Sequence, residues 1–374
     1  MNHLWSKRWP LGLLVLAVLM TGLSGCSGSA RAASWTGLTV AGETLYAADV
    51  EQVVALNGAD GSVVWAFPQN PKEERRGLFY AAPAVDESHV IAASQVPASG
   101  FLSRPKNIVW GLSRETGTLQ WHFDLAAGQY VEGGAISGDT FVIGNSDGNV
   151  YALDVNSGAL RWTLETGHRV WATPLIVSDT VYIGAMDHNL YALDLATGRL
   201  KWKFQAGGAF ASTPALADGV LYSGAFDNHL YAIDAETGAE LWHFSSNDWF
   251  WGSPLVYSDT VYATDVGGRV YAIEAESGHQ IWKSELETKV RAGPALSADG
   301  RLLLVGGQNG TLYALDFSDG YVIWSRDGQG QVLSTPVVNG DVVYELAIYG
   351  SYHIRALHVD NGRDMWAYPP QTED

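Results

Sequence analysis

The sequence predicts an all-β chain folded as an eight-bladed β-propeller of four-stranded antiparallel blades. A glycine followed four residues later by tryptophan recurs through the chain, and most copies stand about forty residues apart. The residues between copies alternate in the manner of strands and lack helical periodicity. Because a small sheet cannot bury both of its faces alone, repeated sheets stack, and closing the stack into a ring hides its open ends. The eight copies are Gly61/Trp65, Gly117/Trp121, Gly158/Trp162, Gly198/Trp202, Gly238/Trp242, Gly278/Trp282, Gly320/Trp324 and Gly362/Trp366.

The repeat is clearest in residues 189–204, which read NLYALDLATGRLKWKF. Residues 190–195 alternate aromatic or branched side chains with smaller ones, a pattern typical of a strand buried between two neighbours. Asp194 and Gly198 then predict a tight turn, because Asp can hydrogen-bond the local backbone and glycine supplies a positive φ. A second hairpin, 174–183, precedes this one, so each repeat contains four antiparallel strands.

The chain is strongly acidic. Its 374 residues include 22 Lys or Arg and 40 Asp or Glu, which gives a formal net charge of −18, and removal of an N-terminal segment that carries Lys7 and Arg8 makes the charge −20. Such a surface repels the phosphates of nucleic acid, whose binding relies on Lys and Arg. It equally disfavours unaided docking on anionic lipid. We therefore expect no nucleic-acid partner.

Residues 1–25 predict an export signal. A short basic stretch is followed by an apolar run, 11–20, that is too short to span a membrane as a helix. The next motif, Leu23-Ser24-Gly25-Cys26, is similar to the bacterial lipobox, in which cleavage precedes a cysteine that receives lipid. Cys26 is the only cysteine, so it forms no internal disulfide. The alternative is a plain cleaved signal with an incidental cysteine.

The later segments follow in order. We expect a short tether at 26–34, the propeller at 35–368 and a tail at 369–374. Repeat two is lengthened by two insertions, 68–76 and 95–106, whereas repeats three to six are regular and the last two are slightly longer. Every repeat has its own set of strands, so no blade is expected to be divided between the two ends of the chain.

The pattern YALDxxTGxxxW at residues 151–162, 191–202 and 231–242 resembles the PQQ-like repeat of quinoprotein-type propellers. The resemblance extends over about 35–368, and the GH and WD signatures of WD40 blades are absent. In that family the repeated tryptophan docks between adjacent blades. The resemblance therefore implies a structural role between blades for Trp65, Trp121, Trp162, Trp202, Trp242, Trp282, Trp324 and Trp366.

Eight such repeats behind a lipid-attachment motif resemble the lipoprotein propeller of the outer-membrane β-barrel assembly machine. This resemblance implies a non-catalytic scaffold that binds a protein partner at the membrane. We expect a location outside the cytoplasm, with lipid on Cys26 as the anchor. In a diderm bacterium we expect the protein at the periplasmic face of the outer membrane, and in a monoderm at the cell surface. The resemblance is one of architecture, and it assigns no partner-contact residues.

Two small residues followed by proline lead into the inner strand of six repeats, and this alignment predicts a candidate binding site. The residue four places before each proline is apolar, which predicts burial. The residues on either side of this apolar residue in the sequence are expected to face the axial channel, where they form an aromatic mouth that includes three cations. The two insertions of repeat two are expected to lie beside this mouth. Such a mouth suits a planar anion, a sugar or a peptide segment, unless these side chains merely fill the channel. The predicted mouth residues are Trp35, Tyr80, Glu132, Arg169, Trp171, Trp249, Trp251, Lys289 and Arg291.

Two other functions would use the same residues. Quinoprotein dehydrogenases with this repeat bind PQQ and calcium on the propeller axis, and Glu132, Arg169 and Trp251 resemble fragments of such a site. A single cysteine excludes their disulfide of adjacent cysteines, and little inserted sequence is present to build the cofactor site. No Ser-His-Asp order, HExxH motif or phosphate-binding glycine loop occurs. We therefore expect no cofactor and no metal, with a PQQ-dependent oxidoreductase and a glycan or peptide receptor as the alternatives.

Overall fold

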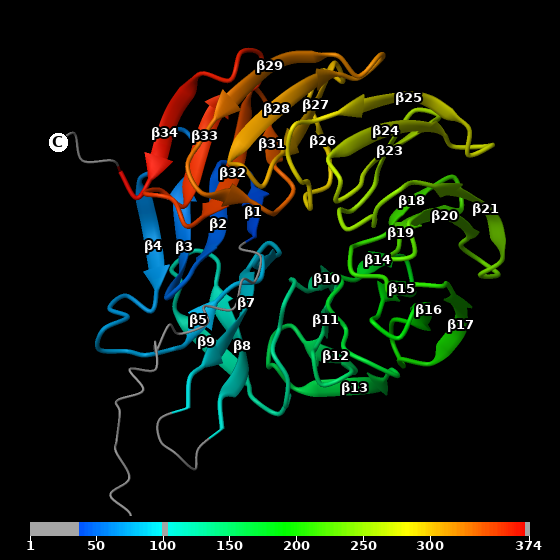
Figure 1. Cartoon of the computed structure of the whole chain (residues 1–374). Coiled ribbons are helices and arrows are strands. Elements are labelled where there is room, and N and C mark those ends of the chain that lie inside the picture. The colour runs from blue at the N-terminus through cyan, green and yellow to red at the C-terminus, as the bar shows by residue number, and fades with distance from the viewer. Residues whose placement is uncertain (1–36, 99–103, 371–374) are drawn as a thin grey trace, which may run out of the picture. The chain divides into compact units, whose positions relative to one another are not determined.

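The computed structural model describes residues 37–98 and 104–370, all within the compact unit Ser34–Asp374. These residues form 34 strands in eight sheets, and they contain no helix. The sheets follow one another around a ring in chain order (Figure 1). The prediction of an all-β, eight-bladed propeller is confirmed. The predicted export signal, Cys26, Trp35 and the last four residues lie outside the described residues.

Blade 1 consists of β1 (Leu38–Ala41), β2 (Thr44–Asp49), β3 (Gln52–Asn57) and β4 (Val63–Phe67). Blade 2 consists of β5 (Leu78–Phe79), β6 (Ala84–Val85), β7 (His89–Val96), β8 (Lys106–Ser113) and β9 (Leu119–Phe123). Blade 3 consists of β10 (Ala135–Ser137), β11 (Thr140–Gly144), β12 (Asn149–Asp154) and β13 (Leu160–Glu165), and blade 4 of β14 (Leu175–Val177), β15 (Thr180–Gly184), β16 (Asn189–Asp194) and β17 (Leu200–Gln205). Blade 5 consists of β18 (Ala215–Ala217), β19 (Val220–Gly224), β20 (His229–Asp234) and β21 (Glu240–Ser245), and blade 6 of β22 (Leu255–Tyr257), β23 (Thr260–Thr264), β24 (Arg269–Glu274) and β25 (Gln280–Glu285). Blade 7 consists of β26 (Ala295–Leu296), β27 (Leu302–Gly306), β28 (Thr311–Asp316) and β29 (Val322–Asp327). Blade 8 consists of β30 (Gln331–Val332), β31 (Val337–Asn339), β32 (Val342–Ile348), β33 (Ile354–His358) and β34 (Asp364–Tyr368).

Most strands pair with their sequence neighbours in antiparallel fashion. In blade 4 the turn between β16 and β17 has the predicted chemistry: Thr197 N donates to Asp194 Oδ1 over 2.9 Å, and Gly198 has a φ of +70°. The register of this hairpin shifts between Ala192 and Leu193. All eight blades repeat the shift at the equivalent place, so it belongs to the repeat itself.

Blades 2 and 8 differ from the four-strand plan at their inner edge. In blade 2 both β5 and β6 pair with β7, and in blade 8 both β30 and β31 pair with β32. The partner strands are longer here, with 8 residues in β7 and 7 in β32 against 5 in β15. Their extra length pairs with the connection from the preceding blade, so the inner strand consists of two short pieces.

The repeated tryptophan links each blade to the next. Trp202 in β17 donates its indole N–H to the carbonyl of Ala235 in blade 5, over 3.0 Å. Its ring also covers Gly238, where a Cβ would lie 2.7 Å from the indole. The tryptophan of one repeat therefore faces the next blade, while the glycine of that repeat receives the preceding tryptophan. Equivalent bonds run from Trp65 to Arg114, Trp121 to Val155, Trp162 to Leu195, Trp242 to Ala275, Trp282 to Phe317, Trp324 to Val359 and Trp366 to Gly58.

The last of these bonds closes the ring. Trp366 and Tyr344 in blade 8 both donate to the carbonyl of Gly58 in blade 1, over 3.0 and 3.1 Å. Leu45 and Ile354 belong to one apolar cluster that contains residues of both blades. Each sheet in the described residues contains only consecutive strands. The ring therefore closes by the same side-by-side packing that joins its other blades, and no blade is divided.

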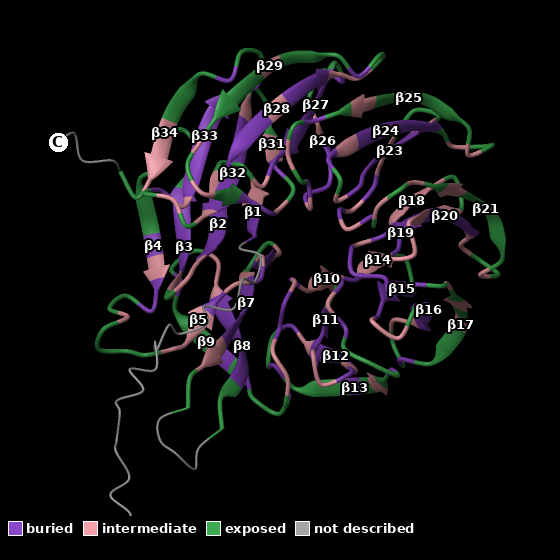
Figure 2. Cartoon of the chain, viewed as in Figure 1, coloured by how far each residue is buried: buried purple, intermediate pink, exposed green. Residues whose placement is uncertain are grey.

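The core lies between neighbouring blades. Figure 2 shows buried residues along the middle strands and exposed residues along outermost strands such as β13, β17 and β21. The six apolar positions that the proline alignment predicts to be buried are at most 1% exposed, which confirms that part of the alignment. They are Phe79, Val170, Phe210, Phe250, Val290 and Val332.

Replacing Trp202 with alanine is expected to lower the free energy of unfolding by about 3 kcal/mol. The change removes an aromatic side chain from the interface between blades 4 and 5, together with its hydrogen bond to Ala235. A Trp202→Phe variant keeps an aromatic ring and should lose about half as much. Denaturant unfolding measures both variants, and midpoints equal to that of the parent would contradict the docking role.

Candidate functional site

One face of the propeller carries both the connections between blades and the middle-hairpin turns. In blade 4, Met186 N in the middle-hairpin turn donates to the carbonyl of Arg169 in the preceding connection, over 2.8 Å. Asp187 Oδ2 in the same turn accepts from Gly167 N, also over 2.8 Å. We call this the connection face. The inner segments start here and continue along the axis, so the predicted mouth residues begin on this face.

The exposed part of the site is an aromatic surface built by blades 5, 6 and 7. Trp249 stacks on Phe226 with ring centroids 5.0 Å apart and an interplanar angle of 15°, and 46% of Trp249 is exposed. Trp251 contacts the same phenylalanine ring, with centroids 4.7 Å apart. Lys289 and Arg291 from blade 7 line a hollow of about 390 Å³ together with both tryptophans. We call these five residues the aromatic rim.

Phe226 does not belong to the predicted mouth, although it supports Trp249. It lies in the middle-hairpin turn of blade 5, where its backbone N–H donates to the carbonyl of Ala209 over 3.0 Å. The equivalent residues of the neighbouring blades are Met186 and Val266. An aromatic residue at that turn position is the sequence signal that distinguishes blade 5.

Arg169 and Trp171 lie on blade 4. The guanidinium of Arg169 stands 6.0 Å from the ring centroid of Trp171, and Trp171 Nε1 donates to Ser146 Oγ over 3.1 Å. Arg169 is exposed and borders a hollow that also contains Asp147 and Glu165. This cation is therefore separate from the aromatic rim and stands beside acids.

An apolar cluster packs within the axial channel at the level of Trp251. Val131 and Leu333 are buried there, and Trp171, Trp251 and Ile348 pack against them. These residues come from blades 3, 4, 6 and 8, so the cluster crosses the axis. We call it the axial plug. Part of the predicted mouth thus fills the channel, while the aromatic rim stays exposed.

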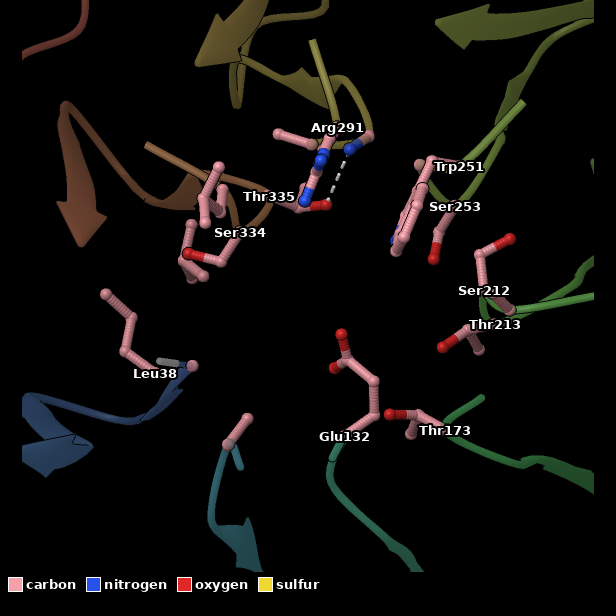
Figure 3. Close-up of a pocket in the computed structure, with 18 residues that line it drawn as sticks. Leu38, Glu132, Thr173, Ser212, Thr213, Trp251, Ser253, Arg291, Ser334 and Thr335 are labelled. Atoms are coloured by element: carbon pink, nitrogen blue, oxygen red, sulfur yellow. Dashed lines mark hydrogen bonds between the residues drawn. The ribbon is translucent and has the colours of Figure 1, made fainter. Parts of the chain in front are cut away.

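Beside the axial plug the channel holds a cavity of about 220 Å³, to which all eight blades contribute. Figure 3 shows Glu132 and Thr173 on one side of it and Arg291 and Thr335 on the opposite side. Six hydroxyl groups line the wall between these charges. They belong to Thr173, Ser212, Thr213, Ser253, Ser334 and Thr335.

Glu132 and Arg291 carry the only charges among the described residues that line this cavity. Enclosure by the ring raises the pKa of Glu132 from 4.5 to about 8, because desolvation disfavours the charged form. Within the described part of the chain, its carboxyl group has no hydrogen-bond or ion-pair partner. Arg291 stands over the Trp251 ring at 4.7 Å, and no acid of the described residues pairs with it. A perturbed acid opposite an unpaired cation is typical of functional sites.

Glycines allow the inner segments to approach one another around this cavity. A Cβ on Gly293 would lie 2.3 Å from the carbonyl oxygen of Ser253, and one on Gly252 would lie 2.5 Å from that of Ala292. Gly293 N also donates to Thr335 Oγ1 over 3.0 Å. Close backbone contact therefore holds the lining residues in place and keeps the cavity small.

The insertions of blade 2 lie on the connection face. Gln129 Nε2 donates to Gln95 Oε1 over 2.7 Å, which ties the long β7–β8 hairpin to the connection that enters blade 3. Arg76, at the end of the first insertion, lies 5.4 Å from the ring centroid of Trp110 in β8. Tyr80 is half-buried and lines neither the hollow of the aromatic rim nor the axial cavity.

The axial cavity does not fit a calcium-bound quinone. Calcium takes about six to eight oxygen ligands, usually with several carboxylates, whereas Glu132 is the only carboxylate among the described lining residues. Across 37–98 and 104–370, no group of three or more His, Cys, Asp or Glu is placed to hold a metal ion. No helix in these ranges has the length and hydropathy needed to cross a membrane.

Comparison with known sequences identifies the relatives of this chain. The family model described as outer membrane protein assembly factor BamB matches residues 3–185, 164–280 and 266–374. BamB of Xanthomonas campestris pv. campestris is 29% identical over 138 residues, which are 36% of this chain and 30% of that protein. The alignment with this curated relative thus spans less than a third of its length.

Solved structures share the fold. BamB of Moraxella catarrhalis has a TM-score of 0.69 at 23% identity, covering 84% of this chain and 91% of that one. A europium-containing methanol dehydrogenase has a TM-score of 0.64 at 14% identity, covering 78% and 77%. At these identities the likeness shows the propeller fold alone. The family model, in contrast, spans nearly the whole sequence, and the chain belongs to the family of the outer membrane protein assembly factor BamB.

Proposed function

We propose that this chain is a non-catalytic scaffold, anchored by lipid outside the cytoplasm, that binds a protein partner through the aromatic rim. The observation that carries the proposal is the exposed stack of Trp249 on Phe226, 5.0 Å between ring centroids, beside Lys289 and Arg291. Membership in a family named for outer membrane protein assembly supports an assembly role.

The aromatic rim has the properties of a binding hot spot. Large aromatic side chains supply much contact area for few rotatable bonds, and a small number of such residues dominates the affinity of many interfaces. Trp249 already rests on Phe226, so little ordering is required when a partner binds. The rim is therefore a preformed anchor for an apolar or aromatic group of the partner.

The charge of the rim fits an acidic partner segment. Lys289 and Arg291 pair with no acid among the described residues, so a partner carboxylate contacts them without breaking an existing ion pair. Asp248, which lines the same hollow, is bonded instead to Arg269 over 2.9 Å. In a chain of net charge −18 these two cations are a local exception. The partner segment we infer therefore carries both acidic and apolar side chains.

Substituting the rim is expected to reduce partner capture. In a Trp249→Ala/Lys289→Glu protein, cross-linking in intact membranes followed by mass spectrometry should recover the partner about tenfold less than with the parent. The matched control, Tyr321→Ala/Arg199→Glu, makes the same kinds of change at exposed residues in outer-hairpin turns on the opposite face. Capture that the rim variant retains, or that the control loses equally, would contradict the proposal.

Removing the cysteine of the lipobox is expected to release the protein from membranes. We infer that residues 1–25 are cleaved and that Cys26 carries lipid, because a basic stretch, an apolar run and the motif stand in the required order. A Cys26→Ala protein should be exported and then found in the soluble fraction on immunoblots. Retention of the exported variant in the membrane fraction would refute the anchor.

The alternatives make different predictions. A glycan receptor would stack a sugar ring on Trp249, and glycan binding that a Trp249→Ala protein loses, with partner capture intact, would favour it. A PQQ-dependent oxidoreductase requires an ion site that the surroundings of Glu132 do not supply. Titration with pyrroloquinoline quinone and calcium is therefore expected to give no dye-linked oxidation of alcohols or sugars.

A further inference from the structure

We propose that the axial cavity binds a small zwitterion, such as a free α-amino acid, with its carboxylate at Arg291 and its ammonium group at Glu132. The proposal begins from one observation. One acidic and one basic side chain line the same cavity, and neither forms an ion pair among the described residues. Arg291 also belongs to the aromatic rim, so a ligand carboxylate at its guanidinium leaves Lys289 as the rim cation for a partner protein.

The ring holds the two charges on opposite sides of the cavity. Glu132 comes from blade 3 and Arg291 from blade 7, and these two residues form no ion pair with each other. In Figure 3 the carboxyl group of Glu132 points into the cavity from one side, and the side chain of Arg291 lies on the other. Contact with Trp251 at 4.7 Å helps to fix the guanidinium. A ligand that satisfies both residues therefore needs one negative and one positive group.

The wall between the charges offers hydroxyl groups. Thr173 and Thr213 line the same wall, and Figure 3 shows the hydroxyl of Thr213 directed toward the cavity. The cavity thus has the polar groups that a small polar ligand requires.

The volume limits the ligand to a few heavy atoms. The cavity measures about 220 Å³, below the roughly 300–1,000 Å³ of pockets for drug-sized molecules. Trp251 and Arg291 line both this cavity and the hollow of the aromatic rim, so the two spaces adjoin each other. A guanidinium binds a carboxylate through two parallel hydrogen bonds. A free amino acid meets the size and both charges, whereas a simple anion or amine satisfies only one.

The proposal is tested by calorimetric titration of the full chain with L-alanine, and with acetate and methylamine as its two charged fragments. We expect L-alanine to bind and each fragment to bind about tenfold more weakly or less. Glu132→Gln and Arg291→Gln should each weaken L-alanine binding by about tenfold or more. Arg169→Gln, which changes a cation outside the cavity, is the matched control and should leave binding unchanged.

Proton release gives a second readout. With a pKa of about 8, Glu132 holds a proton at pH 7, and pairing with an ammonium group requires its ionisation. The observed enthalpy should therefore differ between phosphate and Tris buffers for the parent but not for Glu132→Gln, whose folding is checked by circular dichroism. Three results would overturn the proposal: no binding of millimolar L-alanine, binding that Glu132→Gln leaves unchanged, or acetate binding as tightly as L-alanine.

Discussion

Replacing Arg355 with methionine is expected to lower the free energy of unfolding by about 4 kcal/mol at pH 8. Arg355 and Glu345 stand opposite each other in the β32–β33 ladder, and they are only 4% and 1% exposed. A guanidinium nitrogen of Arg355 lies 2.5 Å from Glu345 Oε1. Methionine would leave a buried carboxylate without its counter-charge, and such a group is far less stable than the intact pair.

The loss should depend on pH. Burial raises the pKa of Glu345 from 4.5 to about 7, although Arg355 acts in the opposite direction. The folded state therefore holds a proton more tightly than the unfolded chain, and this contribution to stability is lost as the pH rises from 4.5 through 7. Without Arg355 the pKa in the folded state rises further. The variant should consequently fall further behind the parent at pH 8 than at pH 5.

Blade 4 supplies the matched control. Its residues at the equivalent ladder positions are Ile183 and Tyr191, and both are buried. A Glu345→Ile/Arg355→Tyr protein removes both charges and should unfold within about 1 kcal/mol of the parent. Urea unfolding at pH 5 and pH 8 measures the three proteins. A double variant as unstable as the single one would mean that Arg355 acts through its other contacts, such as its bond to the Asp327 carbonyl, rather than through its pair with Glu345.

The ring is predictable from sequence because one contact recurs at every interface. Each indole needs a glycine on the following blade, and the contact between Trp366 and Gly61 shows that this also holds where the two ends of the propeller meet. Counting the pairs therefore counts the blades. The proline alignment places Phe210 and its equivalents correctly because the inner segments enter each blade in the same register.

The site is less predictable because its contacts join different repeats. Phe226 supports Trp249 from a hairpin turn in the preceding blade, and no periodicity within a repeat relates the two. In the sequence Glu132 appears as an isolated acid, and its opposing cation Arg291 comes from a blade across the ring. The Glu345–Arg355 pair departs from the repeat, since the equivalent positions of blade 4 hold Ile183 and Tyr191. Departures of this kind carry the chemistry, and a repeat pattern describes only what the blades share.

The exposed and enclosed parts of the site make different physical demands. The aromatic rim is formed by rings that support one another, so it adds contact area without destabilising the fold. The axial cavity contains a half-buried acid that the ring does not pair, and a desolvated carboxylate without a counter-charge lowers stability. A chain that keeps such a group sacrifices stability at that position, as binding sites commonly do. The free energy of unfolding therefore tests whether the carboxyl group of Glu132 in the axial cavity is desolvated.

Replacing Glu132 with glutamine is expected to raise the free energy of unfolding at pH 9 by on the order of 5 kcal/mol. Glutamine has nearly the shape of glutamate but no charge, and it occupies the same place in the axial cavity. In the parent, desolvation raises the pKa of Glu132 to about 8, so at pH 9 the folded state must hold an unpaired carboxylate. The substitution removes that unfavourable charge.

The sign of the pH dependence follows from the direction of the pKa shift. Between about 4.5 and 8 the folded parent keeps a proton that the unfolded chain releases, so the stability of the parent should fall through this window and level off above it. Near pH 4 the parent and Glu132→Gln should unfold at similar temperatures. Thermal unfolding from pH 4 to pH 9 measures both, with Glu236→Gln at an exposed turn of blade 5 as the control that should follow the parent. If Glu132→Gln also follows the parent at every pH, the carboxylate is solvated and already ionised at neutral pH, and the proton release expected when a zwitterion binds in the axial cavity would not occur.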